Sequence, residues 1–151
     1  MRQSGLAFAG AQRTLEAWRK GEAVAANNDG LVTAEDIGTL DLAGTWLVML
    51  SACNTGLGQS QPGEGVLGLR RGFVMAGAQN LLFTLWPVQD DFTARFIVEF
   101  YEAAARSDDA GRALAEIQGK YLKKEREDGS IWSAVRLAGP FVMSSQGTLS
   151  R

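Results

Sequence analysis

The sequence lacks histidine altogether and contains one cysteine, Cys53, among its 151 residues. One cysteine cannot form an internal disulfide, so nothing points to an oxidising compartment and a cytoplasmic setting is expected. A lone cysteine with scattered carboxylates also offers no cluster of soft ligands, and we predict neither a metal site nor a cofactor. The absence of histidine removes the base that normally activates a cysteine nucleophile.

The sequence also lacks a large excess of charge of one sign and any long apolar run. The formal net charge is −2, with 15 basic and 17 acidic side chains, which provides no basic stripe for nucleic acid. No apolar run approaches the roughly 20 residues of a membrane-spanning helix, and the N-terminus lacks the apolar core of a signal peptide. We therefore expect neither nucleic acid nor membrane as a partner. The hydrophobic content of 46% suffices for a sizeable core, and residues 1–151 are expected to form a single domain.

A strand, a helix and a second strand follow one another in the middle of the chain. Residues 47–52 are continuously apolar without alternation, which is typical of a strand covered on both faces. Apolar residues then recur at helical spacing between Val66 and Val74, and residues 80–86 form a second apolar run. Two strands joined through a helix make a parallel crossover unit. We therefore predict an α/β fold whose sheet is mostly parallel and flanked by helices.

Residues 1–45 are expected to be a lead-in to this core. A strand at residues 6–9 is followed by a loose excursion to Gly30, and the first strand can pair with residues 31–32 as a small ribbon. Residues 33–36 match a capping box and predict the start of a short helix.

Residues 46–143 are expected to form the α/β core. Amphipathic helices are predicted from Asp90 and again after Ser107. Residues 132–143 are predicted to be a last strand, broken by a Gly-Pro pair, and residues 144–151 a frayed tail.

Cys53 comes directly after the first central strand, at the carboxyl end where open α/β sheets bind their ligands. Asn54 and Gly56 follow in a turn whose backbone N–H groups can converge on an oxyanion. A thiol with an unperturbed pKa is only about three per cent thiolate at pH 7, so attack requires a neighbour that lowers its pKa. The alternative is that Cys53 is a small apolar residue that fills the core.

A literal G-x-G-x-x-G pattern runs from Gly63 to Gly68. The dinucleotide fingerprint needs its first glycine in the turn right after a strand, whereas Gly63 lies ten positions after Cys53. We therefore attribute these glycines to close packing of a helix, most simply against the sheet.

Asp90 and Asp91 follow the second strand and are expected on the same rim as Cys53. They can hold a cationic side chain of a ligand. Alternatively, they stabilise the first turn of the helix that begins there.

Four motifs occur in order along the chain. They are Ser-Ala-Cys-Asn-Thr-Gly at residues 51–56, Gly-Glu-Gly-Val-Leu-Gly-Leu at 63–69, Ala-Gly-Ala at 76–78 and Leu-Trp-Pro-Val at 85–88. Together they resemble the CHAT domain, a family related to caspases and separases, over nearly the whole chain. The resemblance implies a partial caspase-like sheet and, in active members, a cysteine endopeptidase with a His-Cys dyad, often fused to TPR-type repeats.

By this resemblance Cys53 corresponds to the nucleophile and Gly56 to the turn beside it. Asp90 or Asp91 lies in a loop that lines the pocket for the residue before the cleaved bond, which would favour Arg or Lys there. The dyad histidine belongs to a His-Gly pair that precedes the region of residues 4–6. The chain is therefore expected to be the C-terminal portion of the domain, with the base absent.

Two hypotheses follow. In the first, the chain is the Cys-bearing portion of a peptidase that acts on peptides or proteins and is inactive alone. In the second, it is a non-catalytic interaction or scaffold module. Residues 47–52 have an obvious parallel neighbour on one side only, residues 80–86, so we expect an open sheet edge. Through this edge the chain would self-associate or pair with an upstream segment.

Overall fold

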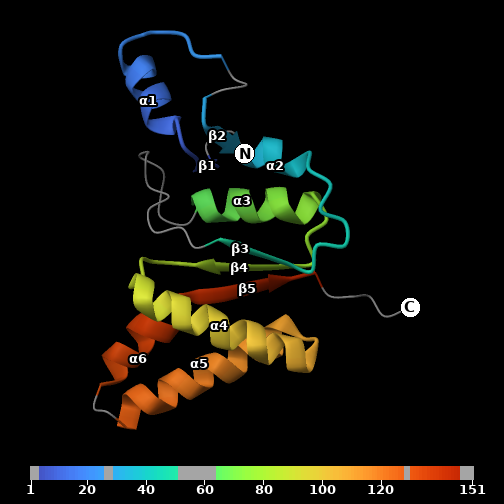
Figure 1. Cartoon of the computed structure of the whole chain (residues 1–151), viewed down its shortest axis with the longest axis vertical. Helices are drawn as coiled ribbons and strands as arrows, with labels where there is room; N and C mark the ends of the chain where they lie inside the picture. Colours follow the sequence, from blue (N-terminus) through green and yellow to red (C-terminus); the bar gives the residue numbers. More distant parts are fainter. Residues whose placement is uncertain (1–3, 26–28, 51–63, 128–129, 147–151) are drawn as a thin grey trace. The chain divides into compact units, whose positions relative to one another are not determined.

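In the computed structural model the chain divides into two compact units (Figure 1). The residues described are 4–25, 29–50, 64–127 and 130–146. Unit 1 comprises Met1–Asp41 and Thr55–Ala76, and unit 2 comprises Leu42–Asn54 and Gly77–Arg151. Both contain helices and a small sheet, which confirms the predicted α/β class. That the whole chain forms one domain stays a prediction.

Unit 1 combines a two-stranded ribbon with three helices. Its elements are β1 (Gly5–Ala7), α1 (Ala11–Arg19), β2 (Leu31–Thr33), α2 (Ala34–Gly38) and α3 (Glu64–Met75). The two strands pair as the predicted ribbon, and they are antiparallel, with Leu6 opposite Val32. The expectation of a loose excursion before Gly30 was wrong, because α1 occupies part of it. Its buried positions are Ala11 and Thr14, too few and too small to stand out as an apolar stripe in the sequence.

The predicted capping box is present at the start of α2. The Thr33 hydroxyl accepts a hydrogen bond from the Asp36 N–H at 3.2 Å, and the Asp36 carboxylate accepts one from the Thr33 N–H at 2.8 Å. Hydrogen bonds from the Thr33 side chain and backbone lower the pKa of Asp36. Two backbone donors at the helix start are thereby satisfied.

Glycines in α3 allow close approach to other parts of unit 1. A Cβ added at Gly72 would lie 2.5 Å from the carbonyl oxygen of Ala34, and one added at Gly68 would collide with the side chain of Ser4. Close packing was the predicted reason for the glycines of this helix, and it is confirmed for Gly68 and Gly72, whereas Gly63 lies outside the described residues. The closest neighbours are Ala34 and Ser4 rather than the strand residues that we expected.

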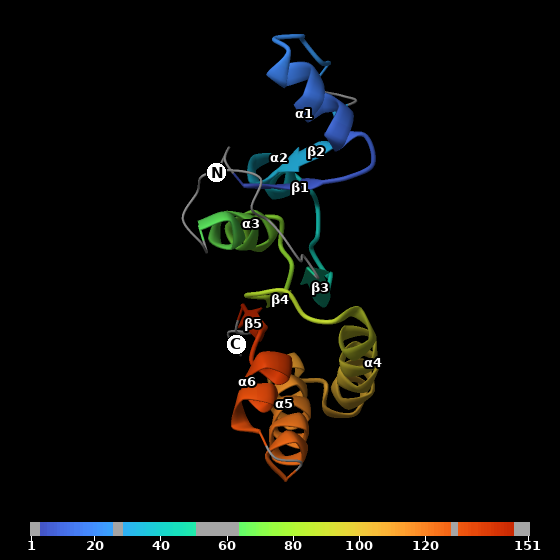
Figure 2. The ribbon, with the colours of Figure 1, turned by 90° about the vertical axis from the view of Figure 1, so that its left-hand side faces the viewer.

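Unit 2 consists of a three-stranded sheet and three helices. Its elements are β3 (Leu47–Leu50), β4 (Asn80–Thr84), α4 (Asp90–Ser107), α5 (Ala110–Glu127), α6 (Ile131–Ala138) and β5 (Phe141–Ser145). The strand order is β3-β4-β5 (Figure 2). Strands β3 and β4 are parallel, whereas β4 and β5 are antiparallel. The sheet is therefore mixed and not mostly parallel, because β5 runs antiparallel to β4.

The segment predicted to be one broken strand, residues 132–143, is a helix followed by a strand. Ser130 caps α6 by accepting a hydrogen bond from the Ser133 N–H, and the buried positions of the helix are Ala134 and Ala138. These two alanines lie four residues apart, which is helical spacing. The strand prediction was wrong here because the bulky apolar residues, such as Trp132 at 80% exposure, lie on the solvent side.

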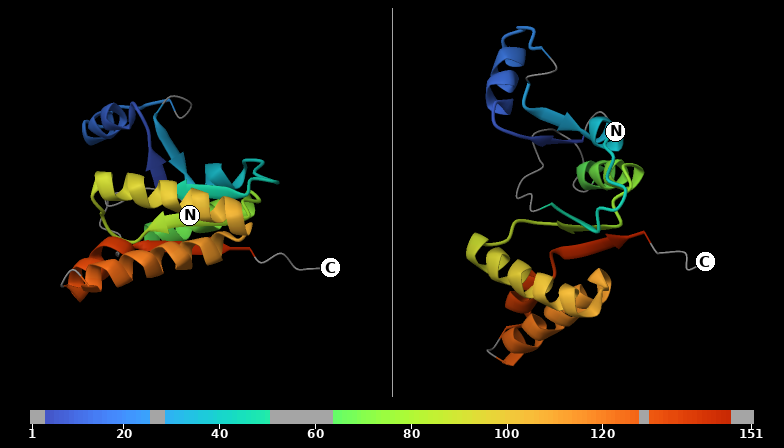
Figure 3. Two further views of the ribbon diagram at one scale, coloured as in Figure 1. Left: turned by 60° about the horizontal axis from the view of Figure 1, so that its bottom comes forward. Right: turned by 45° about the vertical axis from the view of Figure 1, so that its right-hand side comes forward.

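Helices α4, α5 and α6 lie on one side of the sheet (Figures 1 and 3). The core that they enclose centres on Phe96, which is fully buried and stacks on Phe141 with ring centroids 4.0 Å apart. The side chain of Gln118 joins α5 to the α6–β5 connection by donating to the carbonyl oxygens of Ala138 and Phe141 at 2.9 and 2.8 Å. These contacts hold the start of β5 against α4 and α5.

A polar cluster at the surface of unit 2 connects α4 to α5. The Glu99 carboxylate accepts hydrogen bonds from Lys120 at 2.7 Å and from the Tyr121 hydroxyl at 3.1 Å. The hydrogen bond with Lys120 lowers the pKa of Glu99 and raises that of Lys120. Burial, followed by the hydrogen bond to Glu99, raises the pKa of Tyr121.

We expect Glu99→Gln to lower the free energy of unfolding at neutral pH by less than about 1 kcal/mol, because the cluster is partly exposed to solvent. The lowered pKa of Glu99 stabilises the fold above its unfolded-state pKa, and this contribution is lost as the pH falls through the folded-state pKa. Urea unfolding at several pH values measures the effect. The difference between wild type and variant should vanish in acid, and a difference that persists there would contradict the assignment.

Candidate functional site

The carboxyl ends of β3 and β4 form a shared rim in unit 2. The strands are parallel and in register from Leu47 opposite Asn80 to Leu50 opposite Phe83, so both chains leave the sheet on the same side. Cys53 follows Leu50 by three residues in the sequence. Cys53, Asn54 and Gly56, the predicted nucleophile and turn residues, lie outside the described residues.

Asp90 and Asp91 are the first two residues of α4, which begins after the same rim. Both are exposed, and neither caps the helix, because Gln89 occupies the N-cap position. Arg95 donates its Nε–H to the backbone oxygen of Asp91, not to a carboxylate. Within the described part of the chain the two carboxylates have no hydrogen-bond or ion-pair partner. Their charge stabilises the first helical turn and remains available to a cation.

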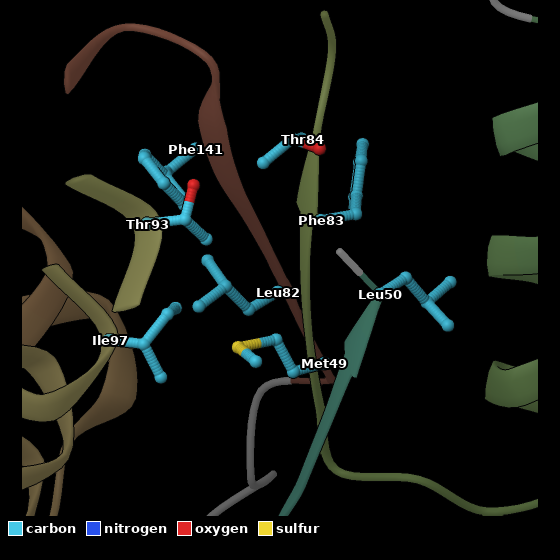
Figure 4. Close-up of a pocket in the computed structure, with 8 residues that line it drawn as sticks. All are labelled: Met49, Leu50, Leu82, Phe83, Thr84, Thr93, Ile97 and Phe141. Atoms are coloured by element: carbon cyan, nitrogen blue, oxygen red, sulfur yellow. The ribbon is translucent and has the colours of Figure 1, made fainter. Parts of the chain in front are cut away.

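A small apolar hollow lies beneath the rim, between the sheet and α4 (Figure 4). Its lining residues are Met49, Leu50, Leu82, Phe83, Thr84, Thr93, Ile97 and Phe141. Figure 4 shows Ile97 and Thr93 of α4 across from Leu82, whereas Leu50 and Phe83 point to the other side of the strands. Because the hollow is too narrow for a water molecule, it is a gap in the core packing and not a ligand pocket.

Thr84, the last residue of β4, was not singled out by the sequence. Its side chain is 8% exposed, and its hydroxyl has no hydrogen-bond partner. An unpaired buried hydroxyl costs free energy relative to one that is hydrated or paired. The sequence carried one available signal, a threonine at the end of an otherwise apolar run.

Leu85 and Trp86 extend the rim beyond β4 as an exposed apolar surface. Leu85 is 54% exposed and Trp86 38% exposed. The Trp86 indole N–H donates to the carbonyl oxygen of Arg136 at 3.3 Å, which rests the ring against the end of α6. The Leu-Trp-Pro-Val motif therefore places the Trp86 ring at the end of α6.

The described residues contain neither a metal-binding cluster nor a membrane-spanning helix. No group of three or more His, Cys, Asp or Glu side chains is arranged there to hold a metal ion. Among the helices of these residues, none has both the length and the apolar character to cross a bilayer.

Comparisons with known proteins identify relatives of this chain. The model of a family described as "CHAT domain" matches residues 1–140. Tetratricopeptide repeat protein 28 from Homo sapiens is 35% identical over 110 residues, which cover 72% of this chain. The matched region is 4% of the human protein, so the chain spans a small part of that relative's length. No solved structure matches the chain.

Proposed function

The chain belongs to the CHAT domain family, and on this premise we propose that it is the Cys53-bearing portion of a CHAT-type cysteine endopeptidase domain. The family is related to caspase-like peptidases, and the peptidase chemistry itself is our proposal. The observation that carries it is the shared rim of β3 and β4, because Cys53 and the Asp90–Asp91 pair follow the same edge of the sheet in sequence.

The proposed reaction is the hydrolysis of a peptide bond through a thioester. The thiolate of Cys53 attacks the carbonyl carbon, and backbone N–H groups of the turn at Asn54 and Gly56 stabilise the oxyanion. The C–N bond then breaks, and the leaving amine takes up the proton that the Cys53 thiol gave up on forming the thiolate. Water hydrolyses the thioester, which releases the carboxylic acid and restores the thiol.

The base for this reaction is absent from the chain, which contains no histidine. Loss of the base in a Ser-His system costs on the order of 10⁶ in turnover. We therefore propose that the 151 residues alone are inactive.

The substrate class follows from the pair of carboxylates at the start of α4. Asp90 and Asp91 are exposed and carry no cationic partner within the described residues. A cationic side chain of a peptide would be held there by charge. We propose a preference for Arg or Lys before the cleaved bond.

Labelling of Cys53 with thiol-reactive peptide probes tests the proposed inactivity. We expect probes carrying Arg or Lys to react with the isolated chain no faster than with a simple thiol, because the sequence contains no histidine to act as the base. The rate should rise about tenfold per pH unit up to about pH 8.5, the ordinary pKa of a cysteine. Mass spectrometry of the labelled chain gives the rate.

Cys53→Ser provides the background for this experiment, and probes with a neutral residue in place of Arg or Lys provide the matched control. Rapid stoichiometric labelling at neutral pH would refute the inactivity, and rapid labelling of Cys53→Ser would show that the probe attacks another group.

A second candidate function is a non-catalytic interaction or scaffold module. The lack of histidine favours it, and so does the relative whose name records tetratricopeptide repeats. In this case TPR-type repeats would be the partner of the domain, and the cytoplasm its location. Reading the DNA upstream of Met1 discriminates the two proposals, since an in-frame His-Gly-bearing strand favours the peptidase and a stop codon favours the module.

Pairing at the sheet edge is common to both candidates. Within the described residues β3 pairs only with β4, so its other side is open to a further strand. We propose that a second polypeptide strand, from an upstream segment or from another copy, pairs with this edge.

A further inference from the structure

We draw no further inference here: the strongest candidate, the exposed apolar surface patch of Ile131, Trp132 and Val135 on α6, carries none because nothing in the described part of the chain shows what covers it.

Discussion

Phe96→Ala should lower the free energy of unfolding by about 3–5 kcal/mol, the largest effect that we expect from a single substitution. Phe96 is fully buried at the centre of the unit 2 core, where it stacks on Phe141 and contacts Phe92 and Tyr121. Removing the ring leaves a cavity between α4 and the sheet that neighbouring rings cannot fill without leaving their own contacts. Since typical domains are stable by only about 5–15 kcal/mol, a shift of this size is readily measured by urea unfolding.

Phe8→Ala is the control for this prediction. Phe8 is 57% exposed, and the same change of side chain should alter the unfolding free energy by less than about 0.5 kcal/mol. Phe96→Leu should fall between the two because it retains part of the buried volume. If Phe96→Ala proved no more destabilising than Phe8→Ala, the described core of unit 2 would be wrong.

Gly72→Ala should destabilise the chain by about 1–3 kcal/mol, although glycine to alanine within a helix is ordinarily favourable. The added Cβ would lie 2.5 Å from the carbonyl oxygen of Ala34. That neighbour is backbone, so relief requires a shift of α2 against α3 and not a change of rotamer. Thermal or urea unfolding measures the loss.

Gly119→Ala provides the opposite expectation in α5. Apart from the backbone of α5 itself, no described atom lies within 4 Å of a Cβ placed there, so the substitution should stabilise the chain by up to about 1 kcal/mol through helix propensity alone. The two substitutions are chemically identical and are expected to have opposite signs. Equal effects would show that the close approach of α3 to Ala34 does not exist in solution.

The site was predicted in part. The parallel arrangement of β3 and β4 follows from two apolar runs joined through an amphipathic helix, and the helix start at Asp90 follows from paired acids before an apolar stripe. The buried hydroxyl of Thr84 was missed, because the partners and exposure of a side chain depend on elements far away in the sequence. The roles of Cys53, Asn54 and Gly56 stay predictions.

Local signals determined the long helices, the capping box of α2 and the first two strands of the sheet, because each depends on periodicity or on contacts between near neighbours in the chain. Only the tertiary structure decided the direction of β5, the helical state of α6 and the neighbours of the α3 glycines. In each case packing between elements decided the outcome. Residues 132–138 have an apolar composition that suits either state, and packing of the small face at Ala134 and Ala138 selected the helix.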